Sequence, residues 1–223
     1  MKIAILSDAH GNTPAFLTTI EEALRYEVSK FFHIGDLIGY VPNLEILDVI
    51  PSLNVEISFT RGNHEDLILR SIFSKEKDEV LNHRLISRIM KKEQREFLEN
   101  FSPYIEHKTN SGIAHLSHGG PVSPIDGYIY EEDCEKLRHL DYAYIFVGNT
   151  HRPFKNKLGS KWIINVGSCG FPRDIGSKGS FALLDTCSGE VELIRFQIPN
   201  IEKIWTKKKL KNIHKSVLDN YYR

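Results

Sequence analysis

The sequence predicts an α/β fold whose first half alternates strands with helices and whose second half is rich in strands. In the first half, three short apolar runs, at residues 3–6, 31–34 and 55–60, are each followed by apolar residues at helical spacing. This repetition is typical of parallel strands joined by right-handed crossovers. Beyond Tyr104 the apolar runs are separated by Gly-Ser and Ser-Gly turns, which indicates hairpins.

The first strand-helix unit places two candidate ligands directly after a strand. The run that starts at Ile3 stops at Asp8, and His10 follows two residues later. Thr13-Pro14 is typical of a helix start, with Thr13 as the predicted cap. Because ligands of open α/β sheets bind beyond the carboxyl ends of the strands, Asp8 and His10 occupy the expected position of a site.

The second and third units repeat this arrangement. Residues 31–34 end at Gly35-Asp36, and a helix predicted over residues 43–50 is stopped by Pro51. Residues 55–60 lead into Gly62-Asn63-His64, where the glycine permits a sharp turn back toward the first two strand ends. All three strands therefore end in polar side chains that suit a binding site.

The remaining chain is predicted to cover and extend this sheet. Residues 66–100 are charged and show helical spacing, which indicates a helical cover over the sheet or its site. A hairpin is predicted over 104–108 and 113–117. Further strands, mostly antiparallel in their connections, are predicted over 144–147, 155–158, 162–166, 181–185 and 191–197.

Composition limits the number of domains and the classes of partner. A chain of 223 residues with 41% apolar residues can bury one substantial core, so residues 1–200 are predicted to form one domain. Lys+Arg and Asp+Glu are both 29, so the overall charge indicates neither a nucleic acid nor a membrane partner.

The three cysteines form no Cys-x-x-Cys motif, which favours free thiols. No apolar run suits a signal peptide or a membrane span, so we expect a soluble, cytoplasmic protein.

Residues 201–223 differ from the rest of the chain in charge. This segment holds seven basic residues against two acidic ones. Its apolar residues, which include Trp205, Ile213 and Val217, are loosely at helical spacing, and they predict a helix or tail docked on the same domain with its lysines in solvent. The alternative is a contact for nucleic acid, although short lysine clusters are common on neutral proteins.

Polar residues after five predicted strands form a candidate metal centre. They offer oxygen or imidazole nitrogen atoms, and they are Asp8, His10, Asp36, Asn63, His118, Asn149 and His151. Such donors suit Mn²⁺, Fe or Zn²⁺ better than a thiolate-bound structural zinc. They are too many for one ion, so we expect two ions, roughly 3.5–4 Å apart, that share one carboxylate. An ion pair of this kind lowers the pKa of a bridging water and indicates phosphoester hydrolysis.

Taken singly, these residues have structural alternatives. Asp36 could cap a helix, Asn63 could occupy a left-handed turn, and Arg173 could be a surface cation. Tyr40 suits a pocket wall or a packing role equally. Other histidines are expected to be structural or solvated: His33, His83, His107, His115, His139 and His214. The order of the motifs, each at a predicted strand end, favours the functional interpretation.

The motifs in this order resemble those of the calcineurin-like metallophosphoesterases. They are Asp8-x-His10, Gly35-Asp36, Gly62-Asn-His-Glu65, His118-Gly119 and Gly148-x-x-His151. The small bacterial and archaeal phosphoesterases of this superfamily are most similar, through residues 35–43, 165–174 and 180–185. The resemblance covers nearly the whole chain. It implies a four-layer αββα sandwich of two mixed β-sheets flanked by helices.

The resemblance also implies a role for each residue. The first ion would be held by Asp8, His10 and His151, the second by Asn63 and His118, with Asp36 between them. His64 would assist the leaving oxygen and Arg173 would bind two phosphate oxygens. The implied reaction is hydrolysis of phosphomonoesters or phosphodiesters by in-line attack of a hydroxide that bridges two divalent ions, with Mn²⁺ preferred to Fe, Zn²⁺ or Ni²⁺.

One position departs from the family pattern. The family usually has Gly-His-x-His where this chain has Gly148-Asn149-Thr150-His151. A neutral amide is a weaker ligand than an imidazole, so we expect the second metal site to lose affinity. Weak activity, or a dependence on added Mn²⁺, follows as a hypothesis.

Two classes of function are compatible with the motifs. The first is a metal-dependent hydrolase acting on a small phosphoester or a nucleotide. The second is a binding protein, because scaffolds such as a retromer subunit resemble this family but lack the catalytic histidine. The presence of His64 favours the interpretation as an enzyme, whereas Asn149 partly supports the interpretation as a binding protein.

Overall fold

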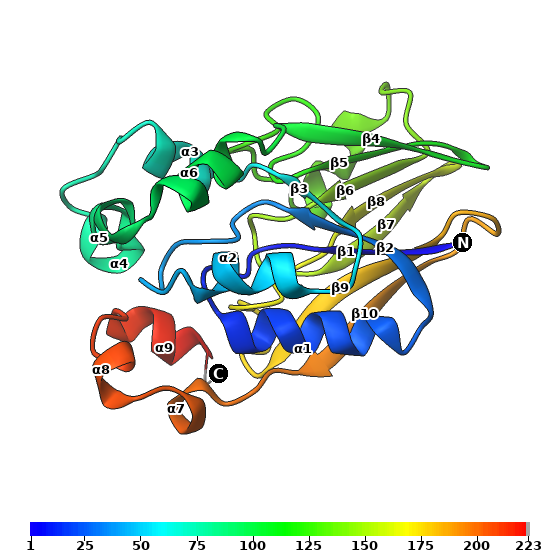
Figure 1. The fold of residues 1–223 in the computed structure, drawn as a ribbon. Coiled ribbons are helices and arrows are strands. Elements are labelled where there is room, and N and C mark those ends of the chain that lie inside the picture. The colour runs from blue at the N-terminus through cyan, green and yellow to red at the C-terminus, as the bar shows by residue number, and fades with distance from the viewer. Residues whose placement is uncertain (222–223) are drawn as a thin grey trace.

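The structure, a computed structural model, describes residues 1–221 and contains two five-stranded sheets packed face to face (Figure 1). The first sheet has the order β10 (Val191–Gln197), β9 (Lys178–Asp185), β1 (Lys2–Leu6), β2 (Val28–Ile34), β3 (Ile57–Thr60). The second has the order β4 (Tyr104–Thr109), β5 (Gly112–Ser117), β6 (Tyr144–Val147), β8 (Lys161–Asn165), β7 (Phe154–Leu158). The predicted sandwich of two mixed sheets with flanking helices is therefore confirmed.

Strand directions agree with the prediction in the first sheet and only in part in the second. Strands β1, β2 and β3 run parallel, as the alternating pattern predicts, while β9 and β10 add antiparallel pairs at one edge. In the second sheet, the connected pairs β4–β5 and β7–β8 are antiparallel, as expected. However, β5, β6 and β8 are parallel to one another, so the expectation of mostly antiparallel strands holds only in part there. The long connection over residues 118–143 returns the chain from the end of β5 to the start of β6, which a parallel pair requires.

Alternation of side chains along β1 divides the interior into layers. Ile3 and Ile5 point into the space between the sheets, where they pack with Phe146 and Ile164 of the second sheet. Ala4 and Leu6 point to the outer face, which is covered by α1 (Thr13–Leu24) and α2 (Glu45–Val49). The outer face of the second sheet is covered by a short 3₁₀ helix, η2 (Glu131–Leu137).

Helix α1 begins with a cap one residue earlier than predicted. The side-chain oxygen of Asn12 accepts a hydrogen bond from the backbone N–H of Ala15 at 3.3 Å, so Asn12 rather than Thr13 is the cap. Thr13 and Pro14 are the first two residues of the helix itself. The helix ends at Leu24, and Val28 already belongs to β2.

The predicted helical cover consists of four short helices. These are α3 (Asn63–Leu69), α4 (Asp78–Leu81), α5 (His83–Ile89) and α6 (Lys92–Glu99). Helices α4 and α5 are separated by Asn82, whose left-handed backbone (φ 56°) interrupts the helical path. The side chain of Asn82 donates to the backbone oxygens of Tyr40 and Asn212, and so ties the cover to two other segments.

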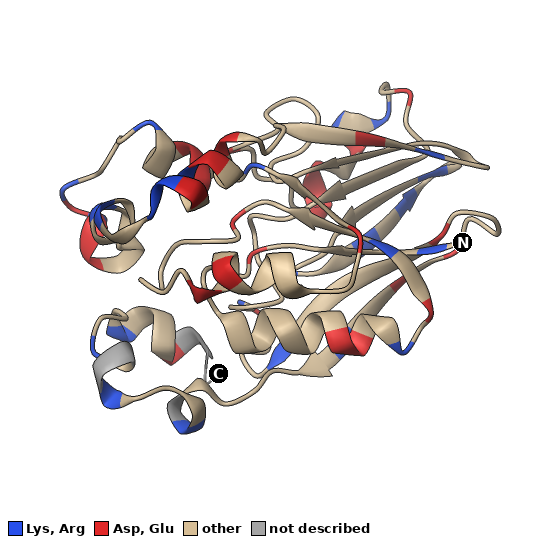
Figure 2. Ribbon diagram, in the orientation of Figure 1, with Lys and Arg blue, Asp and Glu red and all other residues tan. Residues whose placement is uncertain are grey.

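The basic C-terminal segment folds onto the same core as α1, as three short helices. They are α7 (Ile201–Ile204), α8 (Lys207–Leu210) and α9 (Lys215–Tyr221), where a helix or tail was predicted. Trp205, Ile213 and Val217 are buried in this core, whereas Ile204 is exposed. Lysines such as Lys203 and Lys211 project into solvent, and the described basic residues of these helices stand out in Figure 2. Residues 222 and 223, including Arg223, lie outside the described part of the chain.

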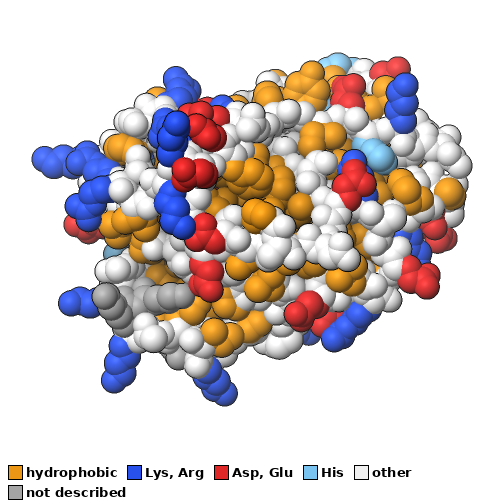
Figure 3. Space-filling view, in the orientation of Figure 1, with side chains coloured by type: hydrophobic (Ala, Val, Ile, Leu, Met, Phe, Trp, Pro, Cys, Tyr) orange, Lys and Arg blue, Asp and Glu red, His pale blue; other side chains and the backbone are white. Residues whose placement is uncertain are grey.

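Helices α3–α6 and α7–α9 gather at one end of the sandwich. In Figure 1 the N-terminus and the start of β1 lie at one end, and helices α3–α6 and α7–α9 lie at the other, where β1 ends. Basic side chains are frequent on this helical end in Figure 3.

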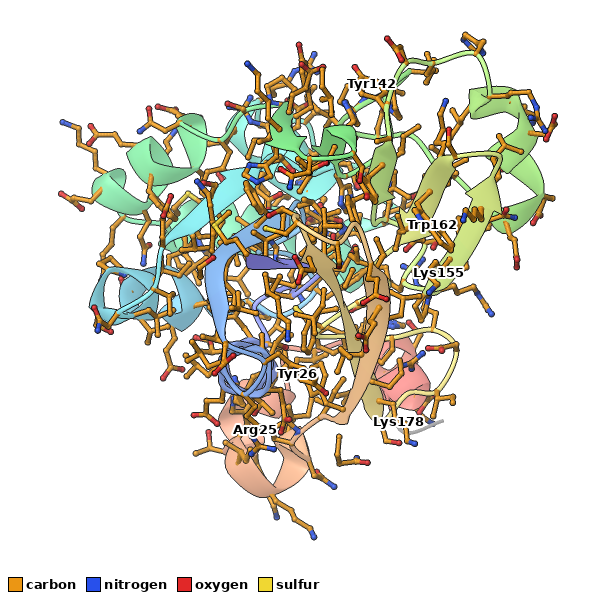
Figure 4. The ribbon with its side chains drawn as sticks, turned by 90° about the vertical axis from the view of Figure 1, so that its right-hand side faces the viewer. Arg25, Tyr26, Tyr142, Lys155, Trp162 and Lys178 are labelled. Atoms are coloured by element: carbon orange, nitrogen blue, oxygen red, sulfur yellow. The ribbon has the colours of Figure 1, made fainter. Side chains whose placement is uncertain are left out.

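At the opposite end of the sandwich, which faces the viewer in Figure 4, the Lys155 ammonium lies 5.0 Å from the centre of the Trp162 ring. Within residues 1–221, every helix is too short or too polar to cross a membrane.

Candidate metal centre

The ends of five strands bring the predicted ligands together. Asp8 follows β1, Asp36 follows β2, and Asn63 begins α3 directly after β3. From the second sheet, His118 follows β5 and His151 follows β6. Because these strands are parallel within each sheet, their carboxyl ends meet at the helical end of the sandwich (Figure 1).

One group of side chains converges on a common point. The Nε2 atoms of His10 and His151 are 3.0 Å apart, and Asp8 Oδ1 lies 3.5 Å from the first and 3.1 Å from the second. All three side chains are buried. Two imidazole nitrogens and a carboxylate oxygen at this spacing offer three donor atoms to one cation.

Asp36 connects this group to a second one. Its Oδ2 atom lies 3.7 Å from His10 Nε2 and 3.2 Å from His118 Nε2. The Oδ1 atom of Asn63 lies 3.2 Å from the same nitrogen of His118. Asp36 Oδ1 accepts a hydrogen bond from the backbone N–H of His64, so Oδ2 is the oxygen left to face both groups. The carboxylate of Asp36 is therefore placed as a bridge would be.

Backbone carbonyls orient two of the imidazoles. The Nδ1 atom of His118 lies 3.0 Å from the oxygen of Ile34, and Nδ1 of His151 lies 2.5 Å from the oxygen of Phe171. A carbonyl can only accept, so the proton of each neutral ring is on Nδ1. This leaves the Nε2 lone pairs directed at the centre, which is the arrangement that metal-binding histidines adopt.

The backbone at the centre is strained. Five of the predicted ligands have a positive φ: Asp8, His10, Asp36, Asn149 and His151, with values from 48° to 65°. The left-handed region is costly for residues with a side chain, and such strain persists where the surrounding structure enforces it, frequently at functional sites. Here it turns successive side chains of one loop, such as Asp8 and His10, toward the same point.

Glycine is required where the third loop meets the second. A Cβ atom on Gly62 would lie 2.2 Å from Asp36 Oδ1 and 2.4 Å from the backbone nitrogen of Asp36. These contacts are far too short for any side chain to be tolerated. The glycine of the Gly-Asn-His-Glu motif therefore lets the chain pass directly over the bridging carboxylate.

The electrostatics of the centre favour a bound cation. Burial alone would raise the pKa of Asp36, but the nearby His118 and His64 outweigh burial and lower that pKa well below its usual range. The pKa of Asp8 is likewise lowered, mainly by His151 and His118 against the effect of burial. Burial works against the charged form of His118, yet Asp36 and Asp8 raise its pKa to about 10. Two buried carboxylates thus remain ionised and require positive charge beside them.

The donor set fits a pair of divalent ions. Asp8 Oδ1 is buried, and it has no hydrogen-bond partner among the described residues although it faces two imidazole nitrogens. Carboxylate, imidazole and amide donors suit Mn²⁺, Fe or Zn²⁺. Three groups of ligand atoms, sharing Asp8, His10 and Asp36, surround the space between the strand ends. The residues present therefore fit a pair of divalent ions.

The other predicted site residues lie around this centre. His64 Nε2 is 3.8 Å from Asp36 Oδ2, and the ring packs against those of His10 and Tyr40. Arg173 is exposed and donates to the Tyr40 hydroxyl at 2.8 Å, on the His151 side of the centre. The side-chain amide of Asn149 donates to the backbone oxygen of Gly127 at 2.9 Å, and its backbone N–H donates to Asp8 Oδ2. Metal coordination by Asn149 and phosphate binding by Arg173 stay predictions.

His83, one of the histidines expected to be structural or solvated, contacts His64 beside the centre. Its Nε2 atom lies 2.9 Å from Nδ1 of His64, and both rings are buried. One of the two nitrogens donates to the other, so His83 fixes the plane of the His64 ring. His83 begins α5 in the helical cover, 19 residues away along the chain, and no local motif marks it.

Glu65 is a second residue to which the sequence analysis gave no role. Its carboxyl group is fully buried and accepts three backbone hydrogen bonds, from Asp36, Ile38 and Gly62, at 2.9–3.0 Å. It thereby joins the loop after β2 to the start of α3. The motif Gly62-Asn-His-Glu65 itself indicates this role. A glutamate at the third position of a helix commonly accepts a hydrogen bond from the backbone N–H of the residue before the helix.

Comparisons with known proteins agree with this geometry. The family model that describes the calcineurin-like phosphoesterase superfamily domain matches residues 1–189. An uncharacterized protein of Methanocaldococcus jannaschii, MJ0912, is 28% identical over 225 residues, covering 92% of this chain and 90% of that protein.

Two solved structures share the whole architecture. The hypothetical protein PH1004 of Pyrococcus horikoshii superposes with a TM-score of 0.83 at 22% identity, covering 100% of this chain and 98% of that one. A metallophosphoesterase of Sphaerobacter thermophilus gives 0.79 at 23% identity, covering 99% and 98%. At this level of identity the likeness concerns the fold, while the family match extends over most of the sequence. This chain belongs to the calcineurin-like phosphoesterase superfamily.

Proposed function

We propose that this protein is a phosphoesterase that uses two divalent metal ions to hydrolyse phosphomonoesters or phosphodiesters. The observation that carries the proposal is the position of Asp36, whose Oδ2 atom faces imidazoles of both ligand groups. When bound, the ions would activate water and withdraw charge from the phosphoryl group. Mn²⁺ is our first choice of metal, followed by Fe, Zn²⁺ and Ni²⁺.

The chain's own residues supply the remaining parts of the reaction. His64 stands beside Asp36 at the centre, with its Nδ1 held by His83, so its Nε2 faces the space where a leaving oxygen would be. Burial lowers the pKa of His64 well below its usual range, which favours the neutral ring. An Nε2–H group there can donate to the departing oxygen and stabilise its developing charge. Arg173, on the other side of the centre, would bind phosphate oxygens and hold the ester in place.

The proposal is tested by hydrolysis of p-nitrophenyl phosphate and bis-p-nitrophenyl phosphate. The protein is stripped of metal with a chelator, and Mn²⁺, Ni²⁺, Zn²⁺ or Mg²⁺ is then added in turn. We expect turnover only after metal is restored. A His64→Ala protein purified in parallel identifies contaminating phosphatase. Absence of hydrolysis with every metal would contradict the proposal and support the alternative of a binding protein on the same fold.

Asn149 leads to a prediction about metal content. Because an amide replaces an imidazole in the second site, protein equilibrated with Mn²⁺ and then desalted should retain about one ion per chain, and the Asn149→His variant about two. Histidine suits this position, since His10 and His151 adopt the same left-handed backbone as Asn149. Elemental analysis by mass spectrometry gives the ion count directly.

A control variant separates the position from the added imidazole. Asn110→His places a histidine in the exposed hairpin turn between β4 and β5, remote from the ligands. Its metal content should equal that of the unmodified protein. Two tightly held ions in the unmodified protein would show that Asn149 does not weaken the second site.

A further inference from the structure

Three cavities open onto the metal centre, and they differ in size and lining. A cavity of about 220 Å³ lies on the side of His151 and contains Arg173. A cavity of about 460 Å³ is lined by His64 and His83, and we name it the leaving-group pocket. A cavity of about 490 Å³ lies beyond Asn63, and we name it the outer pocket.

The walls of the leaving-group pocket combine apolar and aromatic side chains with polar ones. Beside the polar Asn63, His64, Ser74, Lys77 and His83, the pocket is lined by Tyr40, Leu67, Ile72, Phe73, Leu81 and Tyr128. These residues come from the helical cover, from the loop after β2 and from the long connection that precedes β6. Several of them, including Ile72 and Tyr128, are exposed, so the pocket presents apolar surface to water. An apolar group of a ligand would remove this surface from solvent.

The position of His64 indicates which part of a substrate enters this pocket. In the proposed function, His64 assists the oxygen that leaves phosphorus. The organic group attached to that oxygen must then lie against the residues around His64. A volume of about 460 Å³ lies within the range of pockets that hold drug-sized ligands, about 300–1,000 Å³. A small aliphatic alcohol would leave most of it unfilled.

The outer pocket extends the same cleft past Asn63. It shares Asn63, Leu67 and Tyr128 with the leaving-group pocket, so the two form a continuous surface. Its other lining residues are partly apolar and partly polar or charged: Pro103, Pro124 and Ile125, and Asp66, Arg70, Ser123 and Asp126. A phosphorus atom at the centre therefore has room for two organic groups along this cleft, one in each pocket. A phosphomonoester has only one such group, whereas a phosphodiester has two.

From this cleft we infer the substrate class: a small phosphodiester whose leaving alcohol carries a flat aromatic group of nucleoside size, bound against Phe73 and Tyr128. This inference rests on the proposed function and narrows it. Aromatic side chains stack on nucleobases irrespective of the base, and each stacked base contributes appreciably to binding. The second ester group of the substrate would occupy the outer pocket.

Binding of adenosine monophosphate tests the inference independently of turnover. Calorimetry compares adenosine monophosphate with inorganic phosphate on the Mn²⁺-loaded protein, since both offer a phosphate to the centre and only one offers a base. We expect the nucleotide to bind more tightly. Phe73→Ala and Tyr128→Ala should each weaken nucleotide binding by about five- to a hundredfold, with phosphate binding unchanged.

Tyr130→Ala is the matched control. Tyr130 is exposed, stacks beside Tyr128 with ring centres 6.5 Å apart, and does not line either pocket. Its replacement should leave binding of both ligands unchanged. Equal affinity for the nucleotide and phosphate would overturn the inference, as would nucleotide binding that survives both Phe73→Ala and Tyr128→Ala.

Turnover separates failure of this inference from failure of the proposed function. With metal present, we expect kcat/KM for bis-p-nitrophenyl phosphate to exceed that for p-nitrophenyl phosphate by about tenfold or more, because only the diester has a second ester group that can contact the outer pocket. Hydrolysis that favours the monoester would overturn the diester assignment and leave the phosphoesterase proposal intact. Absence of hydrolysis, together with absence of nucleotide binding, would overturn both.

Discussion

Replacing His64 with alanine is expected to lower kcat by about 10²- to 10⁴-fold, the range typical of a lost general acid or hydrogen-bond donor to the transition state. The metal content of the protein should stay the same, because His64 belongs to only one of the three groups of candidate ligand atoms. The other two groups, Asp8 with His10 and His151 and Asp8 with Asp36 and His118, do not include it. The backbone N–H of residue 64 would still donate to Asp36 Oδ1. The loss should therefore appear in the chemical step and not in metal binding.

The measurement combines steady-state kinetics with elemental analysis of the same samples. His139→Ala serves as the control, since His139 is exposed and follows η2, outside the centre. It should retain both activity and metal. A His64→Ala protein that keeps its metal and loses less than about tenfold in kcat would contradict the assignment of His64 to the leaving oxygen.

Variants of His83 test whether the orientation of the His64 ring matters. His83→Phe keeps an aromatic ring of similar size but removes the nitrogen that lies 2.9 Å from His64 Nδ1. We expect a loss of about ten- to a hundredfold in kcat, as is common for residues that orient a functional side chain. His83→Gln keeps a polar atom that can reach His64 and should recover part of this loss. Equal activity of the two variants would indicate that His83 only fills space.

The convergence of the candidate ligands could be predicted because each follows a strand within a few residues. Asp8 and His10 come directly after an apolar run, and Asp36 follows the next one, so strand prediction and side-chain chemistry together locate the centre. The same local logic correctly predicts the parallel order of β1, β2 and β3. Short-range patterns were sufficient here, because the relevant groups are close in sequence to the elements that position them.

Features that depend on distant contacts were missed. His83 meets His64 only because the cover folds back over the centre, and a lone histidine at the start of a helix carries no local sign of this contact. The parallel pairing of β5 with β6 and of β6 with β8 depends on the path of a long connection, whose composition does not reveal its direction. The division of the C-terminal segment into three short helices follows from docking Trp205 and Val217 into the core.

Replacing Glu65 with alanine should lower the free energy of unfolding by about 3–5 kcal/mol, a large fraction of the 5–15 kcal/mol typical of a domain. The change removes the acceptors of three backbone N–H groups at once, from Asp36, Ile38 and Gly62. Each buried N–H left without a partner costs about 1–3 kcal/mol. The side chain is fully buried, so water reaches these groups only if the loops move apart.

Two further variants, Glu65→Gln and Glu96→Ala, test whether the lost stability comes from the three hydrogen bonds of the Glu65 carboxylate. Glutamine keeps one oxygen but turns its NH₂ group toward a backbone donor, so its loss should be intermediate. Glu96 is exposed on α6 and pairs with Lys92 at 3.5 Å, an interaction whose removal should change stability by no more than about 0.5 kcal/mol.

Urea unfolding of the chelator-treated proteins is the appropriate measurement for all three variants, because bound metal would add stability by mass action and mask the difference. A loss below about 1 kcal/mol in Glu65→Ala would mean that the loops find other acceptors for these N–H groups. If the loss is as large as expected, the loops that carry Asp36 and Asn63 are held in place before any metal binds. The fold itself, and not the ion, then preorganises the centre.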